Sequence, residues 1–216
     1  MKNYTKGINS RERLINTARE LFNEQGIGLT LNNLATKMDI TLGMLTHHFP
    51  TKDSIFLAIA EEYEIKRALI RDRFYDGKFT LDMFYRIIEK GMDLQYDYRC
   101  AMRYIASISN NQSDLAKHTT ERYKLNRQLI QKGVEILVSE GELKSTILDN
   151  NNFKVFLFAF SSLTTSWIIN LEIYDYEETF DTIKPVYLNG IFSTFLPYCT
   201  EKGEDSLQKT GMFKLF

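Results

Sequence analysis

A chain of 216 residues, with 44% hydrophobic and 25% charged residues, has the composition of an ordinary globular protein and can bury a sizeable core. Its formal net charge of −1 does not by itself indicate a nucleic-acid partner, although residues 1–56 hold seven Lys and Arg against five acidic residues. Two distant cysteines, Cys100 and Cys199, exclude a disulfide scaffold, and the first residues contain no apolar run typical of a signal peptide, so we expect a cytoplasmic protein.

The first predicted helix covers residues 11–25 and ends at Gly26, its expected C-cap. Its apolar side chains recur at helical spacing, at Ile15, Ala18 and Phe22. A second helix begins after Thr30, whose hydroxyl can accept a hydrogen bond from an amide of the first turn. One face of this helix is apolar and carries Leu31, Leu34, Ala35 and Met38.

The chain must turn at Asp39, a residue type that tolerates the left-handed backbone region better than most. Thr41 then caps another short helix, which Pro50 ends. Leu45 and Phe49 are expected to point inward from this helix. The residues expected to point outward are Leu42, Gly43, Met44, Thr46 and His47.

Two short helices joined by a tight turn are typical of a helix-turn-helix. The segment from Ser10 to Phe56 resembles the DNA-binding domain of the TetR family of transcriptional regulators. The matching residues are Arg13, Leu14, Ile15, Ala18, Leu21, Phe22, Gln25, Gly26, Thr30, Leu34, Ala35, Ile40, Thr41, Gly43, Leu45, His48, Phe49, Pro50, Lys52, Asp53 and Ile55. The resemblance implies that the second short helix enters the major groove of double-stranded DNA.

This chain departs from the family pattern at two positions of the helix-turn-helix. The family usually has Gly at the turn, where this chain has Asp39. It usually has a Tyr that contacts a phosphate at the position of Thr46. A Thr hydroxyl can still donate to a phosphate, so Thr46 stays among the expected contacts.

DNA contacts are expected from the outward face and its two flanks. No Lys or Arg lies on the outward face of the second short helix, so we expect Leu42 and Met44 to contact thymine methyl groups in a site rich in T–A pairs. The alternative is a three-helix module with a purely structural role. The predicted DNA-binding residues are Thr30, Thr41, Leu42, Gly43, Met44, Thr46, His47 and Lys52.

The rest of the chain is predicted to be helical, with turns at residues 76–77, 110–114, 141 and 175–178. No strand alternation or internal repeat is present. The predicted fold is therefore all-α, with an N-terminal three-helix helix-turn-helix domain over residues 1–56. A larger helical ligand-binding and dimerisation domain covers residues 57–200, and residues 201–216 form a polar tail.

Residues 155–171 carry no charge and contain four large aromatic side chains. A membrane span needs about 20 such residues, and this segment is shorter and interrupted by Ser, Thr and Asn. We therefore expect a buried core or interface helix and no membrane partner.

A homodimer is expected from the last two helices, which carry more apolar surface than one subunit is expected to cover. The TetR resemblance implies the same, because these helices commonly form a four-helix interface in that family. The predicted interface residues are Ser161, Thr165, Leu188, Ile191, Phe192 and Phe195.

Aromatic residues make up 13% of the chain, and core packing explains most of them. The TetR resemblance favours in addition an apolar cavity for a small-molecule effector of unknown identity. Large residues from separate helices could line this cavity, namely Phe84, Ile88, Met102, Tyr123, Phe160 and Trp167.

No metal site, cofactor or catalytic residue is predicted. His47 and His48 are adjacent on one helix and diverge by about 100°, so they cannot hold one metal ion together. The function expected from these observations is a ligand-responsive repressor that binds a palindromic operator as a homodimer, and not an enzyme. The alternative is a helical DNA-binding protein without a small ligand that acts through a protein partner.

Overall fold

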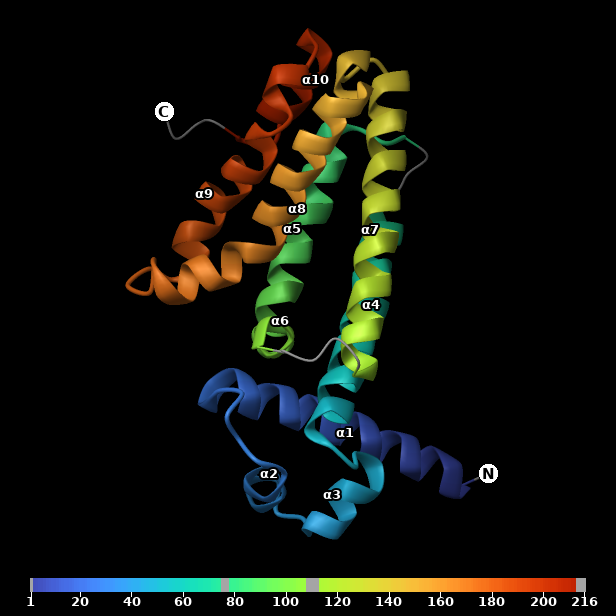
Figure 1. The fold of residues 1–216 in the computed structure, drawn as a ribbon, viewed down its shortest axis with the longest axis vertical. Coiled ribbons are helices and arrows are strands. Elements are labelled where there is room, and N and C mark those ends of the chain that lie inside the picture. The colour runs from blue at the N-terminus through green and yellow to red at the C-terminus, as the bar shows by residue number, and fades with distance from the viewer. Residues whose placement is uncertain (1, 75–77, 108–112, 213–216) are drawn as a thin grey trace. The chain divides into compact units, whose positions relative to one another are not determined.

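The computed structural model describes residues 2–74, 78–107 and 113–212, and of residues 2–10 and 74 only the backbone. Over these ranges the chain is all-α, as the sequence predicts (Figure 1). The α-helices are α1 (Lys2–Gln25), α2 (Leu31–Lys37), α3 (Leu42–His48), α4 (Lys52–Phe74), α5 (Leu81–Asp97), α6 (Arg99–Ser107), α7 (Asp114–Ser139), α8 (Asn150–Ile173), α9 (Phe180–Ser193) and α10 (Glu201–Gln208), with short 3-10 helices η1 (Ser145–Leu148) and η2 (Leu196–Tyr198).

The chain divides into two compact units whose boundaries differ from the predicted ones. The first unit contains residues 1–66 and 94–121, and the second contains residues 67–93 and 122–216. The boundaries fall inside α4, α5 and α7, so each of these helices contributes residues to both units. Loop signals in the sequence cannot locate such a division, because the chain passes from one unit to the other without leaving a helix.

The core of the first unit joins the three N-terminal helices to α4 and α6. The Phe22 ring of α1 packs on Phe56 of α4 with centroids 4.5 Å apart, and Phe56 stacks on Tyr104 of α6 at 3.8 Å. The Asn23 side chain links α1 to α6, since its amide donates to the Asp97 carbonyl and its oxygen accepts from the Cys100 amide. Helix α6 is therefore part of the same core as the helix-turn-helix.

The core of the second unit is an aromatic cluster from α5, α8 and α9. Phe84 of α5 contacts Phe160 of α8 and both Phe192 and Phe195 near the end of α9, with centroids 5.6–6.0 Å apart. Phe156 adds a further ring at 4.8 Å from Phe195. These rings interlock at tilted and edge-on angles, which aromatic pairs prefer.

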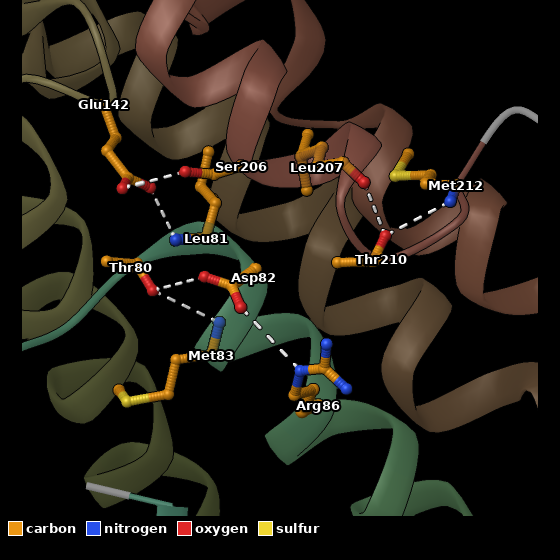
Figure 2. Close-up of polar contacts among 10 residues, drawn as sticks. All are labelled: Thr80, Leu81, Asp82, Met83, Arg86, Glu142, Ser206, Leu207, Thr210 and Met212. Carbon is orange, nitrogen blue, oxygen red and sulfur yellow. Dashed lines mark hydrogen bonds and ion pairs between the residues drawn. The ribbon is translucent and has the colours of Figure 1, made fainter. Parts of the chain in front are cut away.

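The prediction of a polar tail is wrong for residues 201–208, which form α10 (Figure 1) and include Ser206 and Leu207 of Figure 2. Thr200 caps this helix, and Leu207 is buried. The buried Glu142 carboxylate accepts hydrogen bonds from the Leu81 amide at the start of α5 and from the Ser206 hydroxyl of α10, with heavy-atom distances of 2.6 and 3.0 Å. A few buried contacts therefore hold a segment whose composition is polar, while residues 213–216 lie outside the described part.

Helix α8 is long and apolar enough to cross a membrane by length and composition, and it is the one such helix among the described residues. The core helix of a soluble protein passes the same test. Here Phe156, Phe160 and Trp167 are buried inside the second unit, whereas Val155 and Phe158 are exposed. Helix α8 therefore has an inward and an outward apolar face.

Candidate nucleic-acid interface

Helix α2 begins at a capping box. The Thr30 hydroxyl oxygen accepts from the Asn33 amide at 3.1 Å, and the Asn33 side-chain oxygen accepts from the Thr30 amide at 3.2 Å. This reciprocal pair satisfies two amides that the helix leaves free. Leu34 and Ala35 are buried, so the predicted inward face of α2 is confirmed.

The turn after α2 places the next helix. Asp39 has a φ of +53°, in the left-handed region, as expected for this turn. Its amide donates to the Thr36 carbonyl, and the Ile40 amide donates to the Ala35 carbonyl, at 3.2 and 3.0 Å. These two bonds form a Schellman motif, which satisfies the last carbonyls of α2. Ile40 packs against the core of the first unit.

Helix α3, labelled in Figure 1, exposes four of the five residues predicted to point outward, and the fifth, Thr46, is half-buried. The Thr41 hydroxyl oxygen caps the helix by accepting from the Met44 amide at 3.1 Å. Leu45 and Phe49 are buried, whereas Leu42 and Met44 are 42% and 43% exposed. Gly43 and His47 are also exposed. A seven-residue helix with this exposed face has the size and chemistry to lie in a DNA major groove.

Two predicted DNA contacts are engaged inside the first unit. The Thr46 hydroxyl donates back to the Leu42 and Gly43 carbonyls of its own helix. The Lys52 ammonium donates to the Ile27 carbonyl and lies 5.6 Å from the centre of the Phe22 ring. Burial lowers the pKa of Lys52, while the neighbouring Asp53 opposes the shift. The Thr46 hydroxyl has a single proton, so it would have to give up these contacts to donate to a phosphate, whereas the Lys52 ammonium has two further protons for other acceptors.

A shallow groove runs between α2 and α3. It is lined by Thr36, Asp39, Ile40, Thr41 and Met44. Thr36 was not among the predicted site residues, and its exposed position in the last turn of α2 is the signal that could have identified it. The groove therefore extends the outward face of α3 toward the end of α2.

The six residues predicted to line an effector cavity do not come together as one set. Phe84 and Phe160 meet in the aromatic cluster, and Ile88 is half-buried in the same unit. Trp167 instead stacks on Phe180 at 5.3 Å. Met102 packs against the core of the first unit, and Tyr123 is exposed. Helical spacing identified buried residues at Phe160 and Trp167 but not at Tyr123, and it could not say which helix faces meet.

The predicted dimer residues require a correction. Leu188, Ile191, Phe192 and Phe195 are at most 1% exposed, because they pack inside their own chain. Ser161 is also buried, and Thr165 alone of the predicted set is exposed. The prediction that these large side chains of α9 lie in a dimer interface is therefore wrong, whereas α8 exposes large apolar side chains such as Phe158.

Comparison with known proteins agrees with this architecture. Residues 14–74 match the model of the bacterial regulatory proteins of the tetR family. The probable acrEF/envCD operon repressor of Escherichia coli K12 is 24% identical over 211 residues, which cover 89% of each protein.

Two solved structures show the same fold. A TetR-family transcriptional regulator from Marinobacter aquaeolei VT8 is similar with a TM-score of 0.76 and 21% identity, over 93% of this chain and 97% of that one. The SmeT–triclosan complex is similar with a TM-score of 0.66 and 13% identity, over 89% and 93% of the two chains.

The matched segment contains the capped helices α2 and α3, the turn at Asp39 and all of α4. It matches a family of regulatory proteins and not of enzymes. Residues 14–74 therefore match the model of the tetR family of bacterial regulatory proteins, and the chain has the fold of the solved TetR-family regulator from Marinobacter aquaeolei VT8.

Proposed function

We propose that this protein is a homodimeric, effector-responsive transcriptional repressor that binds a palindromic operator. The observation that carries the proposal is the capped helix α3, whose exposed face lies on a tetR-family domain. The curated relative named a probable operon repressor supports repression over activation.

The exposed face of α3 favours a particular kind of operator. Leu42 and Met44 are apolar and can contact thymine methyl groups, while His47 can reach a base edge or a phosphate. This face has no Lys or Arg to form a bidentate contact with guanine. We expect an inverted repeat whose half-sites are rich in T–A pairs, with the contacts of Thr30, Thr41, Thr46 and Lys52 directed at phosphates.

Selection of bound duplexes from a random DNA pool tests this proposal and yields the operator. The expected result is an inverted repeat whose two half-sites are about one helical turn, 10–10.5 base pairs, apart, because a two-fold dimer presents two recognition helices. G-dominated half-sites would contradict the base readout. Failure to enrich any sequence would refute the proposed function.

The outward face of α8 is proposed as half of the dimer interface. Exposed or half-exposed residues recur on it at spacings of three or four residues, which is the pattern of a helix that packs along a partner. Phe158 is 72% exposed and Val155 is 67% exposed. The residues of this stripe are Val155, Phe158, Ser162, Thr165, Ile169 and Ile173.

The outward face of α9 is proposed as the other half of the dimer interface. Figure 1 shows α8 and α9 side by side in the second unit, joined by a short turn. Val186, Gly190 and Ser193 are exposed on α9. Small residues at the centre of both stripes permit close approach of helix backbones, and pairing two copies makes a four-helix bundle.

The effector is proposed to be a neutral or lipophilic small molecule bound in the second unit. The rings of Phe84 and Phe160 offer an apolar surface, and triclosan in the SmeT complex is a small-molecule ligand on a similar fold. These rings contact one another, so an effector among them must displace side chains. Because α4, α5 and α7 belong to both units, a ligand that prefers one arrangement of the second unit can alter the first.

Thermal shift against a metabolite panel, followed by operator binding, tests the effector. A ligand that raises the melting temperature should also weaken operator binding, by roughly 5- to 150-fold for a coupling of about 1–3 kcal/mol. A tight ligand that leaves operator affinity unchanged would show that binding and release are not coupled.

A further inference from the structure

Asp39 has an unfavourable backbone conformation. It is the one residue other than glycine with a positive φ in the described part of the chain. It stands at the left-handed position of the Schellman motif that ends α2. Glycine takes this position most readily and asparagine next, because a side chain crowds the backbone there.

The charge of Asp39 brings a second cost. Its carboxylate follows the C-terminus of α2, where the helix dipole favours a cation. The side chain is exposed and has no hydrogen bond or ion pair with another described residue. Asparagine would complete the same motif without the charge, so the fold does not explain why a carboxylate stands here.

The location of Asp39 offers an explanation. The residue lines the groove between α2 and α3 together with Thr41 and Met44. Thr41 caps α3, the helix proposed to enter the major groove. DNA carries a dense row of negative phosphates, and their attraction to the protein supplies essentially all of non-specific binding. A carboxylate at the edge of the groove between α2 and α3 repels those phosphates. An unfavourable backbone conformation that persists, as at Asp39, is also more common at functional sites than elsewhere.

We infer that Asp39 is an affinity-limiting residue of the operator interface, which weakens all DNA binding through phosphate repulsion. Non-specific complexes then fall apart at moderate salt, whereas the operator complex persists through the base contacts of α3. This inference rests on the proposed function, because it requires α3 to meet DNA.

The test compares the full-length protein with Asp39→Asn, Asp39→Gly and the control Glu61→Gln. Glu61 is an exposed acid on α4 of the same unit, so its replacement makes the same charge change away from the groove. Fluorescence anisotropy measures binding to the selected operator and to a scrambled duplex of equal length, over a range of KCl concentrations.

Removing the charge should tighten binding to both duplexes by about fivefold per half-site near 0.1 M KCl, the size of one surface charge interaction in water. The gain should shrink as salt rises, because screening weakens the repulsion that was removed. Asp39→Asn and Asp39→Gly should bind alike, since both lack the carboxylate, and Glu61→Gln should bind as the wild type does.

Each other outcome has a distinct meaning. If the wild type selects no DNA, the proposed function fails and this inference fails with it. If the wild type binds its operator and Asp39→Asn matches it on both duplexes, the inference alone is wrong. If Asp39→Asn loses affinity only for the operator, Asp39 reads a base edge and the repulsion is overturned. A gain in Asp39→Gly without one in Asp39→Asn would assign the effect to the backbone.

Discussion

At the scale of single residues, the exposed face of α3 includes a glycine, which leaves the helix backbone uncovered at that position. Gly43 lies between Leu42 and Met44 on the outward face, and a Cβ built on it meets no atom within 4 Å. In the proposed operator complex, the absence of a side chain lets DNA approach the helix backbone. The same open space means that a methyl group can be added there without disturbing the fold.

Gly43→Ala should therefore raise the stability of the fold and lower the affinity for the operator. The fold should gain about 0.5–1 kcal/mol, because alanine in a helix loses less conformational freedom on folding than glycine. Operator affinity should fall, because the methyl group stands between α3 and the bases. Gly91→Ala in α5 is the matched control, since its Cβ also meets nothing within 4 Å. Thermal denaturation and operator titration of both variants check this, and equal operator affinity in the two would contradict it.

At the scale of elements, α6 is held to the first helical turn of α4. The Tyr104 hydroxyl of α6 donates to the Asp53 carboxylate at 2.5 Å, and the Tyr104 ring stacks on Phe56. Burial, and then the hydrogen bond to Asp53, raise the pKa of Tyr104 to about 12. The stacked ring and the hydrogen bond are separate contributions, so a phenylalanine can remove one and keep the other.

Tyr104→Phe should lower the free energy of unfolding by about 1.5–3 kcal/mol near neutral pH, the size of a hydrogen bond to a charged group. The contribution of Tyr104 is present below pH 10, its pKa when unfolded, and is lost as the pH rises toward 12, because the folded protein favours the protonated phenol. Urea denaturation at several pH values checks this. The difference between the two proteins should shrink between pH 10 and 12, and a constant difference would argue against the role of the hydroxyl.

Helix α10 depends on one close approach of two backbones. Added to Gly203, a Cβ would lie 2.1 Å from the Glu142 carbonyl oxygen, which no real Cβ can do. The same carbonyl accepts from the Thr200 amide at 3.0 Å. Glu142 thus contacts the start of α10 through its main chain and Ser206 through its side chain (Figure 2).

Gly203→Ala should displace α10 from Glu142. We expect a loss of about 1–3 kcal/mol in the free energy of unfolding, the usual cost of overpacking. Limited proteolysis should then cleave near residue 200 faster than in the wild type. Gly91→Ala again serves as the control, and a Gly203→Ala variant as resistant to protease as the wild type would mean that α10 docks in another way.

At the scale of the whole molecule, the inner and outer faces of α8 and α9 have different roles in the proposed dimer. The inner faces complete the core of the second unit, and the outer faces remain for a second copy. Ile191, 1% exposed, belongs to the first class, and Phe158 belongs to the second. A charge introduced on the inner face should therefore unfold the second unit, whereas a charge on the outer face should prevent dimerisation.

Phe158→Asp should yield a folded monomer that binds the operator weakly, because its second recognition helix is lost. Ile191→Asp should unfold the second unit, because it places a charge in a packed core without a partner. Light scattering and circular dichroism of the two variants check the assignment. A dimeric Phe158→Asp variant would show that the interface lies elsewhere.

The sequence by itself determined the helix-turn-helix, because each of its features is a local rule. Caps at Thr30 and Thr41, the turn at Asp39 and the inward residues Leu45 and Phe49 follow from side chains close together in the chain, and the structure agrees with all of them. The exposed face of α3 follows from the same rules.

Only the tertiary structure decided which side of α8 and α9 faces inward. Periodicity places Leu188, Ile191, Phe192 and Phe195 on one apolar face, but it does not say whether that face packs on its own chain or on a second copy, so their assignment to a dimer interface failed. It likewise decided that residues 201–208 pack as a helix, since the docking of Ser206 and Gly203 depends on Glu142, about 60 residues earlier in the chain. Contacts between segments this far apart leave no local pattern in the sequence.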